Sequence, residues 1–72
     1  METIQFELVG DYVELCQLLK LVGLAESGGQ GKQLVAEGEV KVDGRPESRK
    51  AAKIRAGQVV VCRGLRVAVV GG

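Results

Sequence analysis

The sequence predicts a single α+β domain: an N-terminal strand, two helices, and then short antiparallel strands that form a small sheet. Apolar and polar residues alternate over residues 4–8, which is the period of a half-buried strand. Two helical segments follow, at about 12–22 and 28–37. From residue 40 onward, short β-branched runs alternate with turn signals, and neither a repeat nor a linker divides residues 1–72.

The first helix is expected from about Tyr12 to Val22. Asp11 is a favourable N-cap residue, and Glu14 three positions later completes a capping-box-like pair. The apolar residues that follow have the spacing of one helical face: Leu15, Leu18, Leu19 and Val22. Gly23 then stands where glycine commonly ends a helix.

The second helix is expected over about residues 28–37, with Ser27 and Gln30 as a second capping pair. Its first turn contains Gly28, Gly29 and Gly31, and each glycine costs about 1 kcal/mol relative to alanine. Such a turn indicates a close approach, either by another helix or by a ligand phosphate that meets the backbone N–H groups. Of these two readings we favour tight packing between helices.

Strand and turn signals fill the rest of the chain. Residues 40–42 alternate, Asp43-Gly44 predicts a tight hairpin turn, and Pro46 suits an edge strand or a turn. Residues 48–56 are compatible with a loop or with a single helical turn. Beyond a turn at Gly57, we expect strands over residues 59–62 and 65–70, joined by Arg63-Gly64.

The composition argues against catalysis. The chain has 72 residues and no histidine, which removes the commonest general base and the commonest metal ligand. Cys16 and Cys62 lie in apolar patterns and are interpreted as small core residues. The glycine-rich start of the second helix lacks the Gly-Lys-Ser/Thr ending of a P-loop. We therefore expect no enzyme activity, no metal and no cofactor.

The sequence also indicates where the protein resides. No apolar run approaches the roughly 18 residues that a membrane span requires. The start, Met1-Glu2-Thr3, lacks the basic-then-apolar order of a signal peptide. We expect a cytoplasmic, reduced protein with no membrane partner.

The formal net charge is +1, but the charged residues are distributed unevenly along the chain. Residues 1–31 carry five acids and one base, whereas residues 32–72 carry nine bases and four acids. This asymmetry suggests a polyanion as partner, although a solvated face balanced by nearby acids explains a charge run about equally well. The candidate binding residues are all cations of the second half: Lys32, Lys41, Arg45, Arg49, Lys50, Lys53 and Arg55.

The aromatic content narrows the type of nucleic acid. Phe6 and Tyr12 are the only aromatic residues, and Phe6 lies in the alternating strand. Proteins that bind single strands by stacking bases need more rings. Structured RNA, recognised by its shape and backbone, fits the composition better.

A second hypothesis starts from Gly71-Gly72. Ubiquitin-like sulfur carriers end in two glycines, which can thread the narrow active-site tunnel of a partner enzyme. A frayed chain end explains the same residues. The expected order of elements argues against a carrier, because such proteins open with a two-stranded hairpin before their main helix.

Specific residues from 18 to 44 resemble the S-four-like RNA-binding domain, also called the alpha-L motif. They comprise a helix ending in Gly23-Leu24-Ala25-Glu26-Ser27, a second helix ending in Gly38, and then Val40-Lys41-Val42-Asp43-Gly44. Together with the later Ile54 and Gly57-Gln58-Val59, the resemblance covers about residues 12–62. The segments 26–32 and 47–50 look most similar to stand-alone bacterial YbcJ-type proteins.

The resemblance implies an RNA-binding surface made by the two helices and the following hairpin, with structured RNA as the partner. Ribosomal or transfer RNA, and association with the ribosome, are the corresponding expectations. Many family members have Arg-Leu-Asp where this chain has residues 12–14, and Ser-Arg where it has Ser27-Gly28. These departures move the expected interface toward residues 45–55.

Overall fold

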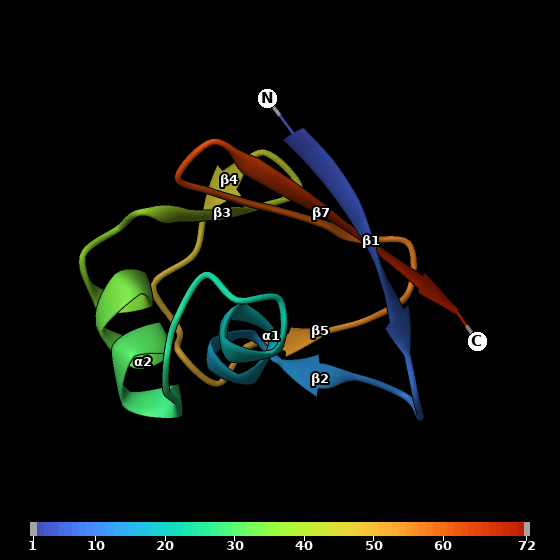
Figure 1. The fold of residues 1–72 in the computed structure, drawn as a ribbon, viewed down its shortest axis with the longest axis horizontal. Helices are drawn as coiled ribbons and strands as arrows, with labels where there is room; N and C mark the ends of the chain where they lie inside the picture. The colour runs from blue at the N-terminus through green and yellow to red at the C-terminus, as the bar shows by residue number, and fades with distance from the viewer. Residues whose placement is uncertain (1, 72) are drawn as a thin grey trace.

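The computed structural model describes residues 2–71 and has the predicted α+β architecture (Figure 1). A strand precedes two helices, and short strands follow them, as expected. In chain order the elements are β1 (Glu2–Leu8), β2 (Val13–Glu14), α1 (Leu15–Leu21), α2 (Gly28–Ala36), β3 (Val40–Val42), β4 (Arg45–Pro46), β5 (Lys53–Ile54), β6 (Val59–Cys62) and β7 (Leu65–Gly71).

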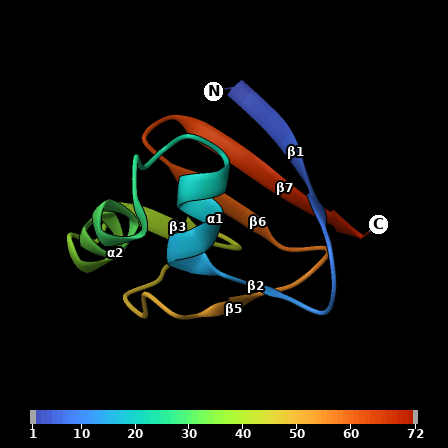
Figure 2. The ribbon, with the colours of Figure 1, turned by 60° about the horizontal axis from the view of Figure 1, so that its bottom comes forward.

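Five strands form one mixed sheet in the order β1-β7-β6-β3-β4. The strands that follow the helices pair antiparallel, as predicted. The N-terminal strand instead runs parallel to β7, from Glu2 opposite Leu65 to Leu8 opposite Gly71. Both helices lie on one side of this sheet (Figures 1 and 2).

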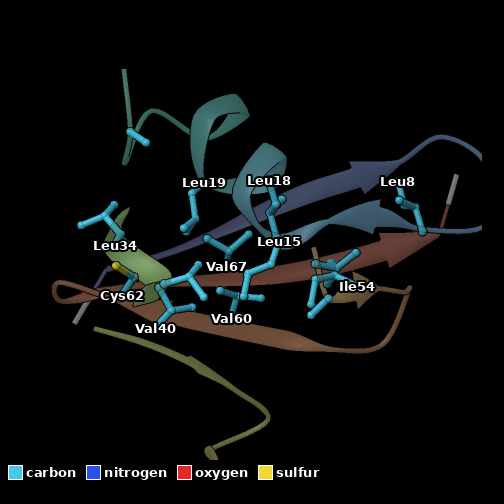
Figure 3. Packing of buried hydrophobic residues seen from close by; sticks show 14 residues of the cluster. Leu8, Leu15, Leu18, Leu19, Leu34, Val40, Ile54, Val60, Cys62 and Val67 are labelled. Carbon is cyan, nitrogen blue, oxygen red and sulfur yellow. The ribbon is translucent and has the colours of Figure 1, made fainter. Parts of the chain in front are cut away.

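The core lies between the sheet and the helices. β6 and β7 alternate in burial, so that Val60 and Val67 are fully buried on the helix side. They pack in one cluster with Leu15 and Leu19 of α1 and with Leu34 of α2 (Figure 3). Each such side chain contributes about 1.5–3 kcal/mol by leaving water, so this cluster is what holds the helices on the sheet.

Helix α1 begins later than the sequence predicts, and Asp11 is not its N-cap. The residues before it form β2, which pairs antiparallel with β5 through Val13–Ile54 and Glu14–Lys53. The cap position is Glu14, which makes no side-chain capping bond. Carbonyl groups of the remote segment 50–52 satisfy the first helical N–H groups instead, so a local capping residue is unnecessary.

Helix α2 begins as predicted, with the Ser27 hydroxyl accepting a hydrogen bond from the Gln30 backbone N–H at 3.1 Å. The expectation of tight helix packing is confirmed at Gly31. A Cβ atom there would lie 2.5 Å from the Cys16 carbonyl oxygen. A Cβ at Gly29 would meet nothing nearer than Ser27 Oγ at 3.8 Å, so only one of these glycines is required by the contact between helices.

The two predicted tight turns are present. Asp43 and Gly44 both have positive φ, at 52° and 83°, as do Arg63 and Gly64, at 51° and 78°. Such turns match the twist of antiparallel strands, which is why they join β3 to β4 and β6 to β7. Residues 48–56, compatible with a loop or a helical turn, contain a turn followed by β5.

Candidate nucleic-acid interface

The seven predicted binding residues are all exposed, and they come from several elements. Four of them belong to one stretch, the connection from β4 through β5 and the residue after it. We call this stretch, residues 49–55, the basic segment; its cations are Arg49, Lys50, Lys53 and Arg55. The other three lie on elements outside the basic segment: Lys32 on α2, Lys41 on β3 and Arg45 on β4.

The backbone of the basic segment is fixed against the start of α1. The Leu15 N–H donates to the Ala52 carbonyl at 2.9 Å, and the Cys16 N–H donates to the Lys50 carbonyl at 3.0 Å. Figure 2 shows β5 beside β2 next to the start of α1. Hydrogen bonds to the carbonyls of Lys50 and Ala52 therefore tie the basic segment to the helix, although little of the segment has regular secondary structure.

Side chains of the basic segment alternate between core and solvent. Ala52 and Ile54 are 8% and 1% exposed, while Lys53 and Arg55 point outward. Two buried apolar anchors thus hold the cations on the surface. Arg49 and Lys53 line the same hollow of about 400 Å³, together with Ala51 and Ala52.

One cation of this surface is partly neutralised by a neighbour. Arg49 donates to Glu47 from Nη2 to Oε1 at 3.0 Å, from Nε to Oε2 at 3.1 Å, and from its backbone N–H to Oε2 at 3.0 Å. These hydrogen bonds lower the pKa of Glu47 to about 2. Arg49 is one of the predicted binding residues, but its guanidinium fork already binds a carboxylate.

Lys41 lies on the other side of the sheet from the helices. Its neighbours Val40 and Val42 face the core, so the strand alternation turns Lys41 outward. The register places it beside Val61 of β6, which in turn lies beside Arg66 of β7. Lys41 and Arg66 therefore share the outer face of the sheet, whereas the basic segment borders α1 on the helix side.

Sequence reasoning missed Tyr12 as a surface residue, because it was assigned to the start of a helix. The ring lies just before β2 and is 42% exposed. Lys53 Nζ is 5.0 Å from the ring centroid, and Arg55 Cζ is 5.8 Å from it. Tyr12 is the one aromatic residue outside the apolar pattern of the sequence, and this feature could have identified it as a surface residue.

The ion pair of Arg63 with Glu39 and the two cysteines have structural roles. Arg63 donates to Glu39 from Nη2 to Oε2 at 3.0 Å, and this bond lowers the pKa of Glu39. Cys16 and Cys62 are buried, as predicted, and burial raises the pKa of the Cys62 thiol. Within residues 2–71, no group of three or more histidine, cysteine, aspartate or glutamate residues could hold a metal ion. The helices of this stretch are too short or too polar to cross a membrane.

The fold and the surface define a known class of protein domain. Residues 6–70 match the model of the S4 domain family, so the chain belongs to that family. It is similar to the Escherichia coli (strain K12) protein named "Putative RNA-binding protein YbcJ", with 59% identity over 59 residues, which are 82% of this chain and 84% of YbcJ. A solution structure of YbcJ from E. coli, described as revealing an alpha-L motif involved in RNA-binding, is also similar to this structure. The match covers 97% of this chain and 87% of that chain, at 51% identity and a TM-score of 0.65.

Two further relatives show how widely such sequences occur. The Bacillus subtilis (strain 168) protein named "Probable ribosome maturation protein RlbA" is 37% identical over 54 residues, which are 75% of this chain and 76% of RlbA. A tyrosine–tRNA ligase of Ralstonia nicotianae is 39% identical over 62 residues, which are 86% of this chain and 16% of the ligase.

Proposed function

We propose that this protein binds structured RNA through the basic segment and does so without catalysis of its own. The observation that carries the proposal is the way the segment is held. Buried Ala52 and Ile54, together with two hydrogen bonds to α1, fix a backbone whose four cations point to solvent. Membership of the S4 domain family and the similarity to YbcJ, whose alpha-L motif is described as involved in RNA-binding, support it.

The physical basis is electrostatic. Lysine and arginine neutralise phosphates and release the counterions condensed on RNA, which gives affinity that does not depend on sequence. Because the segment is already ordered, binding loses less conformational entropy than it would for a flexible basic tail. In this proposal Lys32 and Arg45 extend the contact from neighbouring elements, and Lys41 reaches RNA that passes the edge of the sheet.

The names of the relatives suggest which RNA to test first. RlbA is named for ribosome maturation, and the ligase acts on transfer RNA by name, so ribosomal and transfer RNA are the proposed partners. Association with the ribosome follows as part of the same proposal, as does location in the cytoplasm, where both RNAs are used. The relatives give no support to the alternative of a sulfur carrier. That alternative depends on Gly72, which lies outside the described residues, while Gly71 is paired with Leu8 inside the sheet.

A pair of matched charge reversals tests the proposal. The variant R49E/K50E/K53E reverses three cations of the basic segment, and the control K20E/R63E/R66E makes the same change of net charge elsewhere. We expect the first variant to abolish binding of a structured RNA at low salt and the control to weaken it only slightly. For the wild type, log affinity should fall with log salt by roughly 0.7 to 0.9 per phosphate contact.

Three outcomes would contradict the proposal. Equal weakening by the two triple variants would mean that bulk charge, rather than this surface, attracts RNA. Unchanged affinity in R49E/K50E/K53E would place the interface elsewhere. A thiocarboxylate at the C-terminus, detected by mass spectrometry of the protein from cells, would favour the carrier alternative. Circular dichroism of each variant verifies that the fold is retained.

A further inference from the structure

Tyr12 is an exposed aromatic ring in a chain that has only one other aromatic residue. Phe6 packs against the hydrophobic cluster, as an apolar ring normally does. Tyr12, at 42% exposed, lies outside that cluster and against two cations. An aromatic ring that does not fill the core, and that is held at the surface by charged neighbours, is available to contact a ligand.

The pairing of β2 with β5 explains why these side chains meet. Val13 faces Ile54 across the ladder, and both turn toward the core. Side chains on either side of this pair therefore turn outward, which puts Tyr12 together with Lys53 and Arg55. Glu14, directly opposite Lys53 in the register, is the carboxylate on the same outward side.

We propose that Tyr12, Lys53 and Arg55 form a platform on which one unpaired nucleotide of the bound RNA stacks. This rests on the proposed function and names its substrate class more closely: structured RNA that carries an unpaired base beside a helical stem. A nucleobase stacks on an aromatic ring, and the guanidinium of Arg55, which lies over the Tyr12 ring, offers a second planar surface. Lys53 and Arg55 also neutralise the phosphate that comes with the same nucleotide.

The position of the platform suits such a ligand. Lys53 belongs both to the platform and to the hollow that it lines with Arg49, so the base and the neighbouring phosphates would contact one continuous surface. The ring is presented by a backbone that is paired to β5 and followed directly by the hydrogen bonds of Leu15 and Cys16. A fixed ring stacks at lower entropic cost than one on a mobile loop.

The test compares two RNA hairpins that differ in one base. Both have the same stem with a single-nucleotide bulge; one bulge carries adenine, and the other is abasic and keeps only the sugar and phosphate. We expect the wild type to bind the adenine bulge roughly tenfold more tightly, the scale of one stacked base. The preference should persist in Tyr12→Phe, which keeps the ring, and disappear in Tyr12→Leu, which keeps only apolar bulk.

Tyrosine fluorescence provides a second readout. Tyr12 is the single tyrosine and the chain has no tryptophan, so the signal comes from this ring alone. At saturation the adenine bulge should quench it and the abasic bulge should not. Equal affinity of the wild type for the two hairpins, or a preference that persists in Tyr12→Leu, would overturn the platform while leaving RNA binding intact. Failure to bind either hairpin at low salt would overturn the proposed function instead.

Discussion

Individual ion pairs decide how much of the formal charge is available to a ligand. Glu47 and Arg49 are two residues apart, and the turn between β4 and β5 folds the Glu47 carboxylate onto the Arg49 guanidinium. The Glu47 side chain is 17% exposed and that of Arg49 is 79% exposed, so the acid sits beneath the cation. In the proposed interface, RNA phosphates therefore compete with Glu47 for Arg49.

Removing this competitor should strengthen RNA binding. In Glu47→Gln the neutral amide no longer holds the guanidinium by charge, so Arg49 becomes available to a phosphate. We expect affinity for structured RNA to rise about threefold, the scale of one exposed ion pair, and to depend more steeply on salt. Fluorescence anisotropy across a salt series measures both effects.

The chain offers a matched control for this substitution. Glu39→Gln removes the same charge from the pair that Glu39 makes with Arg63, away from the basic segment. Affinity should change less in this variant than in Glu47→Gln. If the two variants behave alike, the gain comes from net charge and Glu47 does not regulate access to Arg49.

At the scale of elements, the contact between α1 and α2 depends on a glycine, Gly31, which has no side chain. The site where a Cβ of residue 31 would lie is taken by the carbonyl group of Cys16, which is backbone and cannot rotate away. The helices approach this closely because Gly31 has no side chain. The same approach holds α2, which carries Lys32, against α1, whose first N–H groups bond to the basic segment.

A pair of alanine substitutions separates this packing effect from helix propensity. Gly31→Ala should destabilise the protein by about 1–3 kcal/mol, because the added methyl group must push the helices apart. Gly29→Ala adds the same methyl group where its nearest neighbour is Ser27 Oγ at an ordinary contact distance of 3.8 Å, so it should be neutral or stabilising by up to about 1 kcal/mol. Urea unfolding monitored by circular dichroism gives both values. A Gly31→Ala protein as stable as the wild type would show that the helices can move apart freely.

Local sequence patterns were sufficient to predict a helix cap, a tight turn and the strands themselves, but not the strands with which they pair. The Ser27 cap, the turn at Asp43-Gly44 and the alternating strands depend on residues a few positions apart, and all were predicted. The start of α1 could not be predicted, because its N–H groups bond to Lys50 and Ala52, far along the chain. Tyr12 was missed for the same reason, since its cations come from β5.

On the scale of the whole molecule, the sheet joins the two ends of the described chain. β1 pairs with β7 along its full length, and Ile4, Phe6 and Leu8 pack into or against the core. The hydrophobic pattern predicted that β1 is a strand, but its partner was not predictable, because parallel pairing leaves no turn signal. Within residues 2–71, the buried apolar residues form one cluster, and this cluster includes Leu8 of β1.

Loss of one side chain of β1 should therefore weaken distant regions as well. We expect Phe6→Ala to lower the free energy of unfolding by about 2–4 kcal/mol and to speed hydrogen exchange at the Leu15 and Cys16 amides, because unfolding is cooperative. Gln5→Ala, on the exposed face of the same strand, should leave both unchanged. Exchange measured by NMR tests this; unchanged protection of these amides in Phe6→Ala would mean that the basic segment is held independently of β1.

The parallel pairing of β1 with β7 also has a consequence during protein synthesis. β1 is translated before the helices, whereas its only sheet partner within residues 2–71 is translated after them, from Leu65 onward. While residues 9–64 emerge, β1 has no strand to pair with, and the apolar side chains that it contributes stay in water. The nascent chain can form its helices and its hairpins early, but β1 packs into the sheet only once β7 is present, and until then its unpaired edge is open to chaperones and to wrong partners.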